Sequence, residues 1–157
     1  MKTNIGLSDK EKQGCIGILD RVLSDEYVLY TKTRNYHWNV TGPDFSELHK
    51  FFEVQYAELN IVIDDVAERA RALGGRSLGS LAEFLKETRL KEDKSGSTDS
   101  KHMLKSLLAD HEAIIQLLRK DVDACTDDHH DTGTADFLTG LMEQHEKTAW
   151  MLRAYLS

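Results

Sequence analysis

A single proline, Pro43, interrupts a chain whose apolar residues otherwise recur at helical spacing over long stretches. Proline and glycine weaken the interior of a helix, and most of the 10 glycines also lie outside these stretches. This distribution favours long helices over a sheet-rich fold with many turns. The 157 residues correspond to one domain, which can bury a core without disulfides or a structural metal.

Four long helices and one short helix are predicted. Ser8 followed by Glu11 is a capping box, and it begins the first helix after a short polar tail at residues 1–7. The expected helices cover approximately residues 8–38, 44–73, 80–86, 99–125 and 134–156. The polar segments 91–100 and 126–132 are predicted to be a loop and a turn. The sequence therefore predicts an all-α fold, a four-helix bundle with the short helix in a long crossover between the second and third long helices.

Charge and cysteine content narrow the class of protein. The formal net charge is −7, which does not suit coating nucleic acid but suits a partner that is itself a cation. Cys15 and Cys125 lack any metal-binding spacing, so we expect reduced, buried or half-buried thiols in a cytoplasmic protein. We find neither a secretory signal pattern nor an apolar run of 18 residues, and we expect no membrane association.

Four potential metal ligands share one face of the second predicted helix. They are His49, Glu53, Asp64 and Glu68. At about 100° per residue they fall within about 100° of one another. The apolar stripe of the same helix lies on nearly the opposite side and consists of Leu48, Phe52, Leu59, Val62 and Val66. The potential ligands are therefore expected to point away from the core of their own chain.

One chain cannot bring this set to one metal ion. His49 and Glu68 are about 28 Å apart along a helix that rises about 1.5 Å per residue, whereas metal–ligand bonds are near 2 Å. The four positions are symmetric about a point between Glu58 and Leu59. Two copies packed antiparallel would place His49 beside the partner's Glu68 and Glu53 beside the partner's Asp64, twice per isologous dimer.

Two other interpretations of these residues remain. The face could be an ordinary solvated acidic surface, because a histidine and a glutamate four residues apart are common on helices. A di-iron site inside the bundle would use a Glu-x-x-His motif on each of two helices, and this sequence contains no such motif. His111 and His145 fall on the apolar stripes of the last two long helices, where we expect hydrogen-bonded core residues.

Two long segments carry a resemblance to a known family. "YHWNVTGPDFSELHKFFEVQYAELNIVIDDVAER" and "TADFLTGLMEQHEKTAWMLRAYL" resemble the Dps proteins, or mini-ferritins, and the resemblance extends over nearly the whole chain. It implies a ferritin-like bundle and a hollow dodecamer with tetrahedral symmetry. It also implies iron storage and protection from oxidative stress, with Fe(II) oxidised by hydrogen peroxide in preference to dioxygen and ferric oxide stored in the cavity.

The resemblance assigns roles to individual residues. His37, His49 and Glu53 of one subunit, with Asp64 and Glu68 of the other, would form a ferroxidase centre for two irons. Trp38 corresponds to a tryptophan beside the iron that takes up oxidising equivalents. Glu53 stands where the family often has aspartate, which changes the reach of the ligand without removing it.

Acidic residues gather near the start of the fourth long helix. They are Asp127, Asp128, Asp131 and Asp136. Helix capping and compensation of the helix dipole are one explanation. The resemblance places this region at a three-fold channel through which iron enters, with Asp136 as the best-matched position and Asp131 next.

DNA binding is the alternative function. Members of this family that bind DNA directly often carry a lysine-rich N-terminal arm, but Lys2 is the only lysine clearly within the tail of this chain. A strongly anionic particle would repel phosphate. Direct DNA binding and association with the nucleoid are therefore less favoured than iron oxidation.

Overall fold

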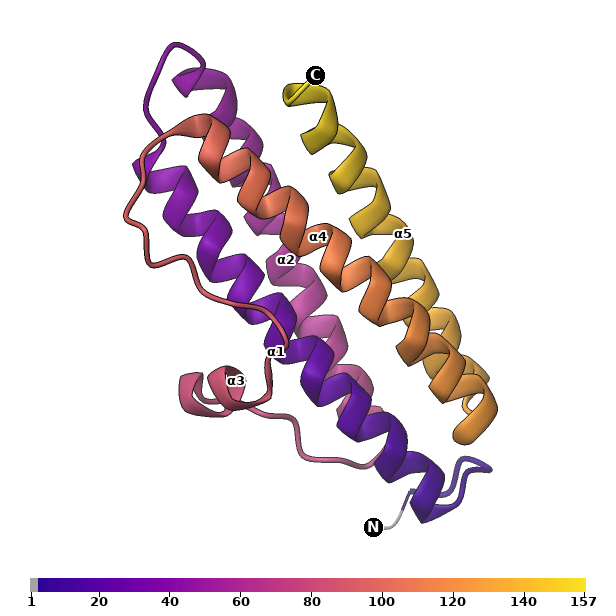
Figure 1. Cartoon of the computed structure of the whole chain (residues 1–157). Coiled ribbons are helices and arrows are strands. Elements are labelled where there is room, and N and C mark those ends of the chain that lie inside the picture. Colours follow the sequence, from indigo (N-terminus) through magenta and orange to yellow (C-terminus); the bar gives the residue numbers. More distant parts are fainter. Residues whose placement is uncertain (1–2) are drawn as a thin grey trace.

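The computed structural model describes residues 3–157, and Figure 1 shows a bundle of long helices. The helical elements of this part of the chain are α1 (Asp9–Asn39), α2 (Phe45–Ala72), α3 (Leu81–Glu87), α4 (Ser100–Asp123), the π-helical turn η1 (Ala124–Asp128) and α5 (Thr132–Tyr155). Residues 3–157 contain no β-strand, only an isolated bridge between Thr41 and Asp99. The predicted all-α four-helix bundle with a short helix in its crossover is confirmed.

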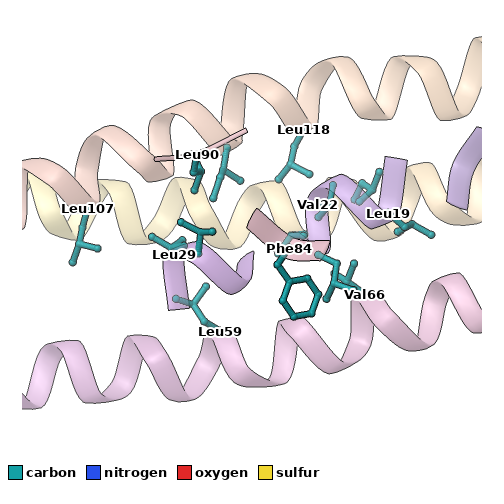
Figure 2. Close-up of a cluster of buried hydrophobic side chains, with 14 of the residues drawn as sticks. Leu19, Val22, Leu29, Leu59, Val66, Phe84, Leu90, Leu107 and Leu118 are labelled. Carbon is teal, nitrogen blue, oxygen red and sulfur yellow. The ribbon is translucent and has the colours of Figure 1, made fainter. Parts of the chain in front are cut away.

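The core lies between the four long helices. Figure 2 shows leucine and valine side chains of α1, α2 and α4 converging there, among them Leu29, Leu59 and Leu107. Phe84 of α3 joins them, and its ring stacks on Tyr27 with ring centroids 4.2 Å apart. This contact fixes α3 against the side of α1, outside the four-helix layer (Figure 1).

Local sequence signals set the ends of the helices. At the start of α1, the Ser8 backbone N–H donates to the Glu11 carboxylate at 2.6 Å, and the Glu11 N–H donates to the Ser8 hydroxyl at 3.3 Å. The same reciprocal arrangement joins Ser80 and Glu83 at the start of α3. Gly74 ends α2 with a φ of 93°, a conformation that glycine adopts without a steric cost.

Buried ion pairs fasten the crossover to the bundle. Arg89 donates to the Asp25 carboxylate of α1 at 2.8 Å and to the Asp121 carboxylate of α4 at 2.8 Å. Thr88 adds a hydrogen bond to Asp25 at 2.9 Å. Because Asp25 is almost fully buried, these bonds replace the water that its charge would otherwise require. The connection that follows α3 is thereby held across α1 and α4.

The prediction of a polar turn at residues 126–132 is wrong for the first half of this segment. Residues 124–128 continue α4 as a π-helical turn, and α5 then begins at Thr132, two residues earlier than expected. The Asp131 N–H donates to the Cys125 carbonyl at 2.9 Å, which links the wide turn to the next helix. The exposed polar residues that follow Cys125 favoured a turn, whereas the buried Cys125 side chain holds this segment against the core.

The two cysteines are free and buried, as predicted, although they come together in space. Their sulfur atoms are 3.7 Å apart. Burial is the main cause that raises the pKa of Cys15 to about 11, and it also raises the pKa of Cys125. Both thiols therefore remain protonated at neutral pH.

Two further observations concern the chain as a whole. Between residues 3 and 157, none of the helices combines the length and apolar character needed to cross a membrane. Residues 3–7, expected as a polar tail, lie against the bundle, because the Lys12 ammonium donates to the Thr3 carbonyl at 3.1 Å and Leu7 packs on the core. Lys2 lies outside the described residues.

Candidate metal centre

Two histidines form a latch between α1 and α2. The His37 and His49 rings stack with centroids 3.8 Å apart and an interplanar angle of 21°. The Nδ1–H of His37 donates to the His49 carbonyl at 2.7 Å, and the Nδ1–H of His49 donates to the His37 carbonyl at 2.8 Å. A carbonyl oxygen can only accept, so each Nδ1 must carry the proton. In the neutral ring of this tautomer, Nε2 carries the lone pair through which imidazole binds a metal.

The predicted acidic ligands lie on the outer face of α2. Glu53, Asp64 and Glu68 are exposed, whereas His49 is half-buried and His37 is only 7% exposed. Leu48, Phe52, Leu59 and Val66 are buried on the opposite side of the helix, as the sequence predicted. No residue in the part of the chain described forms a hydrogen bond or ion pair with the three carboxylates. Their oxygen atoms are free to meet a cation or a second protein surface.

The structure brings together only part of the predicted ligand set. His37 and His49 are in contact, but α2 carries Asp64 and Glu68 about four and five helical turns away from His49. Within residues 3–157 of one chain, no three histidine, cysteine, aspartate or glutamate side chains are grouped closely enough to hold a metal ion. One chain therefore contains two separated groups of ligand-type residues on one continuous face.

Aromatic and cationic groups surround the histidine latch. Trp38 follows His37 at the end of α1 and is 63% exposed. The Arg34 guanidinium lies 5.1 Å from the centroid of the Trp38 ring, a cation–π distance. The Tyr56 ring meets the His37 ring edge-on, with centroids 5.2 Å apart. Trp38 is therefore accessible and adjacent to the latch.

The acidic residues near α5 have different environments. Asp131 is 5% exposed and caps α5, accepting from the Thr134 N–H at 3.0 Å and from Arg69 at 3.2 Å. Although burial opposes ionisation, the bonds from Thr134 and the charge of Arg69 lower the pKa of Asp131. Asp136 is exposed. The contacts of Asp131 are those of a helix cap, whereas Asp136 can meet solvent cations.

Sequence reasoning missed a chain of polar side chains in the core. His111 and His145 were expected to be satisfied by hydrogen bonds, but His111 Nε2 has no partner in the described part of the chain. Glu26 and Gln55, both buried, also have unpartnered side-chain atoms there. The sequence contained a signal for this polar series. Each of the four residues interrupts the apolar inward face of a different long helix.

Comparison with known proteins identifies a matching family and several relatives. Residues 16–157 match the family described as "Ferritin-like domain". An uncharacterized low temperature-induced protein of Nostoc sp. is 47% identical over 155 residues, which cover 99% of this chain and 87% of that protein. The DNA protection during starvation protein 2 of Bacillus anthracis is 37% identical over 142 residues, 90% of this chain and 96% of that protein.

A solved structure agrees with these relatives. The Dps protein from Vibrio cholerae O1 superposes with a TM-score of 0.92 at 32% identity, covering 100% of this chain and 98% of that one. That protein is described as a member of a broad superfamily of ferritin-like diiron-carboxylate proteins. The chain therefore belongs to the ferritin-like domain family and, within it, to the Dps proteins.

Proposed function

We propose that this protein is an iron-storage ferroxidase of the cytoplasm. It oxidises Fe(II), with hydrogen peroxide preferred over dioxygen, at sites shared by two copies of the chain, and it stores the ferric product inside a dodecameric shell. The observation that carries the proposal is the outward face of α2, which holds the histidine latch at one end and the free carboxylates of Asp64 and Glu68 at the other.

The antiparallel pairing of two α2 helices would complete the site. It would place the latch and Glu53 of one copy beside the partner's Asp64 and the partner's Glu68. Large apolar side chains support such an interface, since Val54 is 56% exposed and Ile61 is 61% exposed along the same helix. Leu81 and Leu85 of α3 are likewise exposed near Trp38, around a groove of about 320 Å³. Apolar patches of this kind mark interaction surfaces.

The residue types suit the chemistry of the substrate. Neutral imidazole nitrogen tolerates Fe(II), and carboxylate oxygen stabilises Fe(III). Each hydrogen peroxide takes one electron from each of two Fe(II) ions and two protons, its O–O bond breaks, and two waters form. Taking both electrons together avoids the release of hydroxyl radical. Trp38, exposed beside the latch, would accept an oxidising equivalent when only one iron is present.

Iron must reach these sites through the shell. In the proposed dodecamer, Asp136 at the start of α5 would line a three-fold channel and attract cations, because it is exposed and acidic. Asp131 would support this channel indirectly by holding the first turn of α5, since its carboxylate is already engaged by Thr134 and Arg69.

Mixing two defective variants tests the shared site. A chain with His37→Gly and His49→Gly lacks the latch, and a chain with Asp64→Asn and Glu68→Gln lacks the acidic half. Each alone should oxidise Fe(II) slowly under anaerobic mixing with peroxide. When the two are refolded together, a mixed pair contains one site with every ligand, so about a quarter of the wild-type activity should return.

The control uses two chains that carry the same defect. Mixing the latch variant with an epitope-tagged copy of itself should restore no activity, because every site still lacks its histidines. Absence of recovery in mixed pairs whose assembly is verified by the tag would overturn the shared site. Full activity of either variant alone would overturn the ligand assignment.

The names of several relatives favour a second candidate function, the binding and protection of DNA. The net charge of −7 opposes it. A gel-shift measurement at about 0.15 M salt, with and without a chelator, separates the two cases. Retardation that survives chelation would establish direct binding, whereas no retardation would leave iron oxidation as the function.

A further inference from the structure

A hydrogen-bonded chain of ionisable groups crosses the core of the bundle. Glu26 of α1 lies 2.8 Å from Nε2 of His145 on α5. Nδ1 of His145 lies 2.9 Å from Nδ1 of His111 on α4. All three side chains are at most 3% exposed. None of these residues belongs to the outward face of α2 that forms the proposed ferroxidase site.

Several polar atoms in and beside this hydrogen-bonded series have no partner. Glu26 Oε2 and His111 Nε2 form no hydrogen bond within residues 3–157, and neither does the side-chain amide of Gln55, which is 3% exposed. Polar atoms so deeply buried are nearly always paired with protein, water or an ion. Burial and the neighbouring His145 lower the pKa of His111 well below its usual value, so this imidazole is neutral.

A small cavity adjoins the two histidines. Its volume is about 20 Å³, and Gln55, His111 and His145 contribute to its wall. About 10–15 Å³ is sufficient to hold one water molecule, so a single water or a single metal ion would fill it. Glu58 and Gln144, which are exposed, also line the cavity and mark a route to it between α2 and α5.

We propose that His111 and His145 bind one zinc-type divalent cation inside the bundle, through their facing Nδ1 atoms. Two nitrogens bound to a tetrahedral ion lie about 3.3 Å apart, so the rings would separate by only ~0.4 Å from their present spacing. The amide oxygen of Gln55 and a water in the cavity would supply the remaining positions. The proton now held between the imidazoles would move to Nε2 of His111.

Glu26 acts here as a positioning residue. Its bond to Nε2 of His145 fixes that ring with Nδ1 unprotonated and facing His111. Histidines that bind metals commonly donate their other ring N–H to a carboxylate in this manner. Two imidazoles favour zinc and the late first-row ions over magnesium or calcium. The site thus differs in ligands and in chemistry from the outward iron-oxidising face.

Crystals of the full-length protein soaked in zinc chloride provide the direct test. We expect an anomalous difference peak between His111 Nδ1 and His145 Nδ1 in the unmodified protein. The outward carboxylates serve as an internal control, because zinc that has diffused through the crystal should also appear there. A peak on the outward face with only water between the two histidines would overturn the proposal.

Cobalt(II) binding in solution gives an independent measurement. In the Asp64→Asn, Glu68→Gln variant, whose outward face has lost two of its proposed ligands, the visible spectrum of four-coordinate cobalt should appear at one equivalent per chain. In that background the spectrum should vanish when His111→Phe is added, and the affinity should weaken about 10–100-fold when Glu26→Gln is added. His130→Asn, which changes an exposed histidine, is the matched control and should bind as the unmodified chain does. Equal cobalt binding by folded His111→Phe would refute the site.

Discussion

The outward face of α2 and the polar chain in the core use the same residue types in opposite ways. On the outward face, the carboxylates of Asp64 and Glu68 are exposed and have no partner in the described part of the chain. In the core, Glu26 and His145 are buried and bonded to each other at 2.8 Å. The difference shows that histidine and carboxylate content alone does not define a metal site. Burial and the remaining free atoms decide what each group can bind.

The two regions are also close neighbours along the chain. Gln55 points into the core and Glu53 lies on the exposed face, although only one residue separates them on α2. One helix therefore serves the bundle on one side and, in our proposal, a second copy of the chain on the other. Substitutions on α2 should separate into two groups, one affecting stability and one affecting iron oxidation.

The largest expected effect is on stability and arises in the core. His145→Ala leaves the Glu26 carboxylate buried without a partner and should lower the free energy of unfolding by about 3–5 kcal/mol. Asp64→Asn on the exposed face should change it by no more than about 0.5 kcal/mol. Urea unfolding with a chelator present measures both. Replacing Glu26, His111 and His145 together by leucine should recover most of the loss, and equal effects of the single core and surface changes would contradict this contrast.

The next effect concerns the rate of iron oxidation. The combined His37→Gly and His49→Gly changes remove the latch and should slow oxidation by on the order of 100-fold or more, because loss of even an indirect partner of a metal ligand costs about 10–100-fold. Stopped-flow absorbance of Fe(III) after anaerobic mixing with Fe(II) and peroxide measures the rate. His130→Asn is the control with an unchanged rate. An unaltered rate in the latch variant would remove these histidines from the site.

A smaller effect distinguishes the two aspartates near α5. Asp131→Ala removes a helix cap and the partner of Arg69, and it should cost about 1–2 kcal/mol in the free energy of unfolding. Asp136→Ala should leave stability within about 0.5 kcal/mol and slow iron uptake instead. Chemical unfolding and iron-loading rates give the two readings. The reverse pattern would show that Asp131, despite its burial, is the residue that guides iron.

The smallest expected effect is a loss of stability at alkaline pH. Burial raises the pKa of Cys15 to about 11, so an unfolded chain loses this thiol proton at a lower pH than the folded chain. Stability should therefore fall gradually as pH rises above about 8.5, and the fall should be shallower in Cys15→Ala. Unfolding curves across this pH range measure the slope. Rapid alkylation of the folded protein at pH 8 would instead show that the thiols are accessible.

The sequence predicted much of this structure because the decisive signals were local. The Ser8 and Glu11 capping box and the break at Pro43 placed the helix ends, and helical periodicity oriented α2 correctly. The π-helical turn at Cys125 escaped prediction because the residue that it brings into the core contacts Cys15, which is distant in the sequence. The polar chain in the core escaped for the same reason, since its bonds join α1, α4 and α5.

The histidine latch has a consequence for the order in which an active particle is made. His37 and His49 are only 12 residues apart, so their contact closes a short loop, an event that takes tens of nanoseconds in a flexible chain. A newly synthesised chain can thus prepare its half of the proposed site almost as soon as α1 and α2 leave the ribosome. In the proposed dimer, the remaining ligands come from another chain and arrive only when two chains collide. Onset of iron oxidation would then follow the square of the concentration of new chains, which would keep scarce, unassembled copies inert toward peroxide.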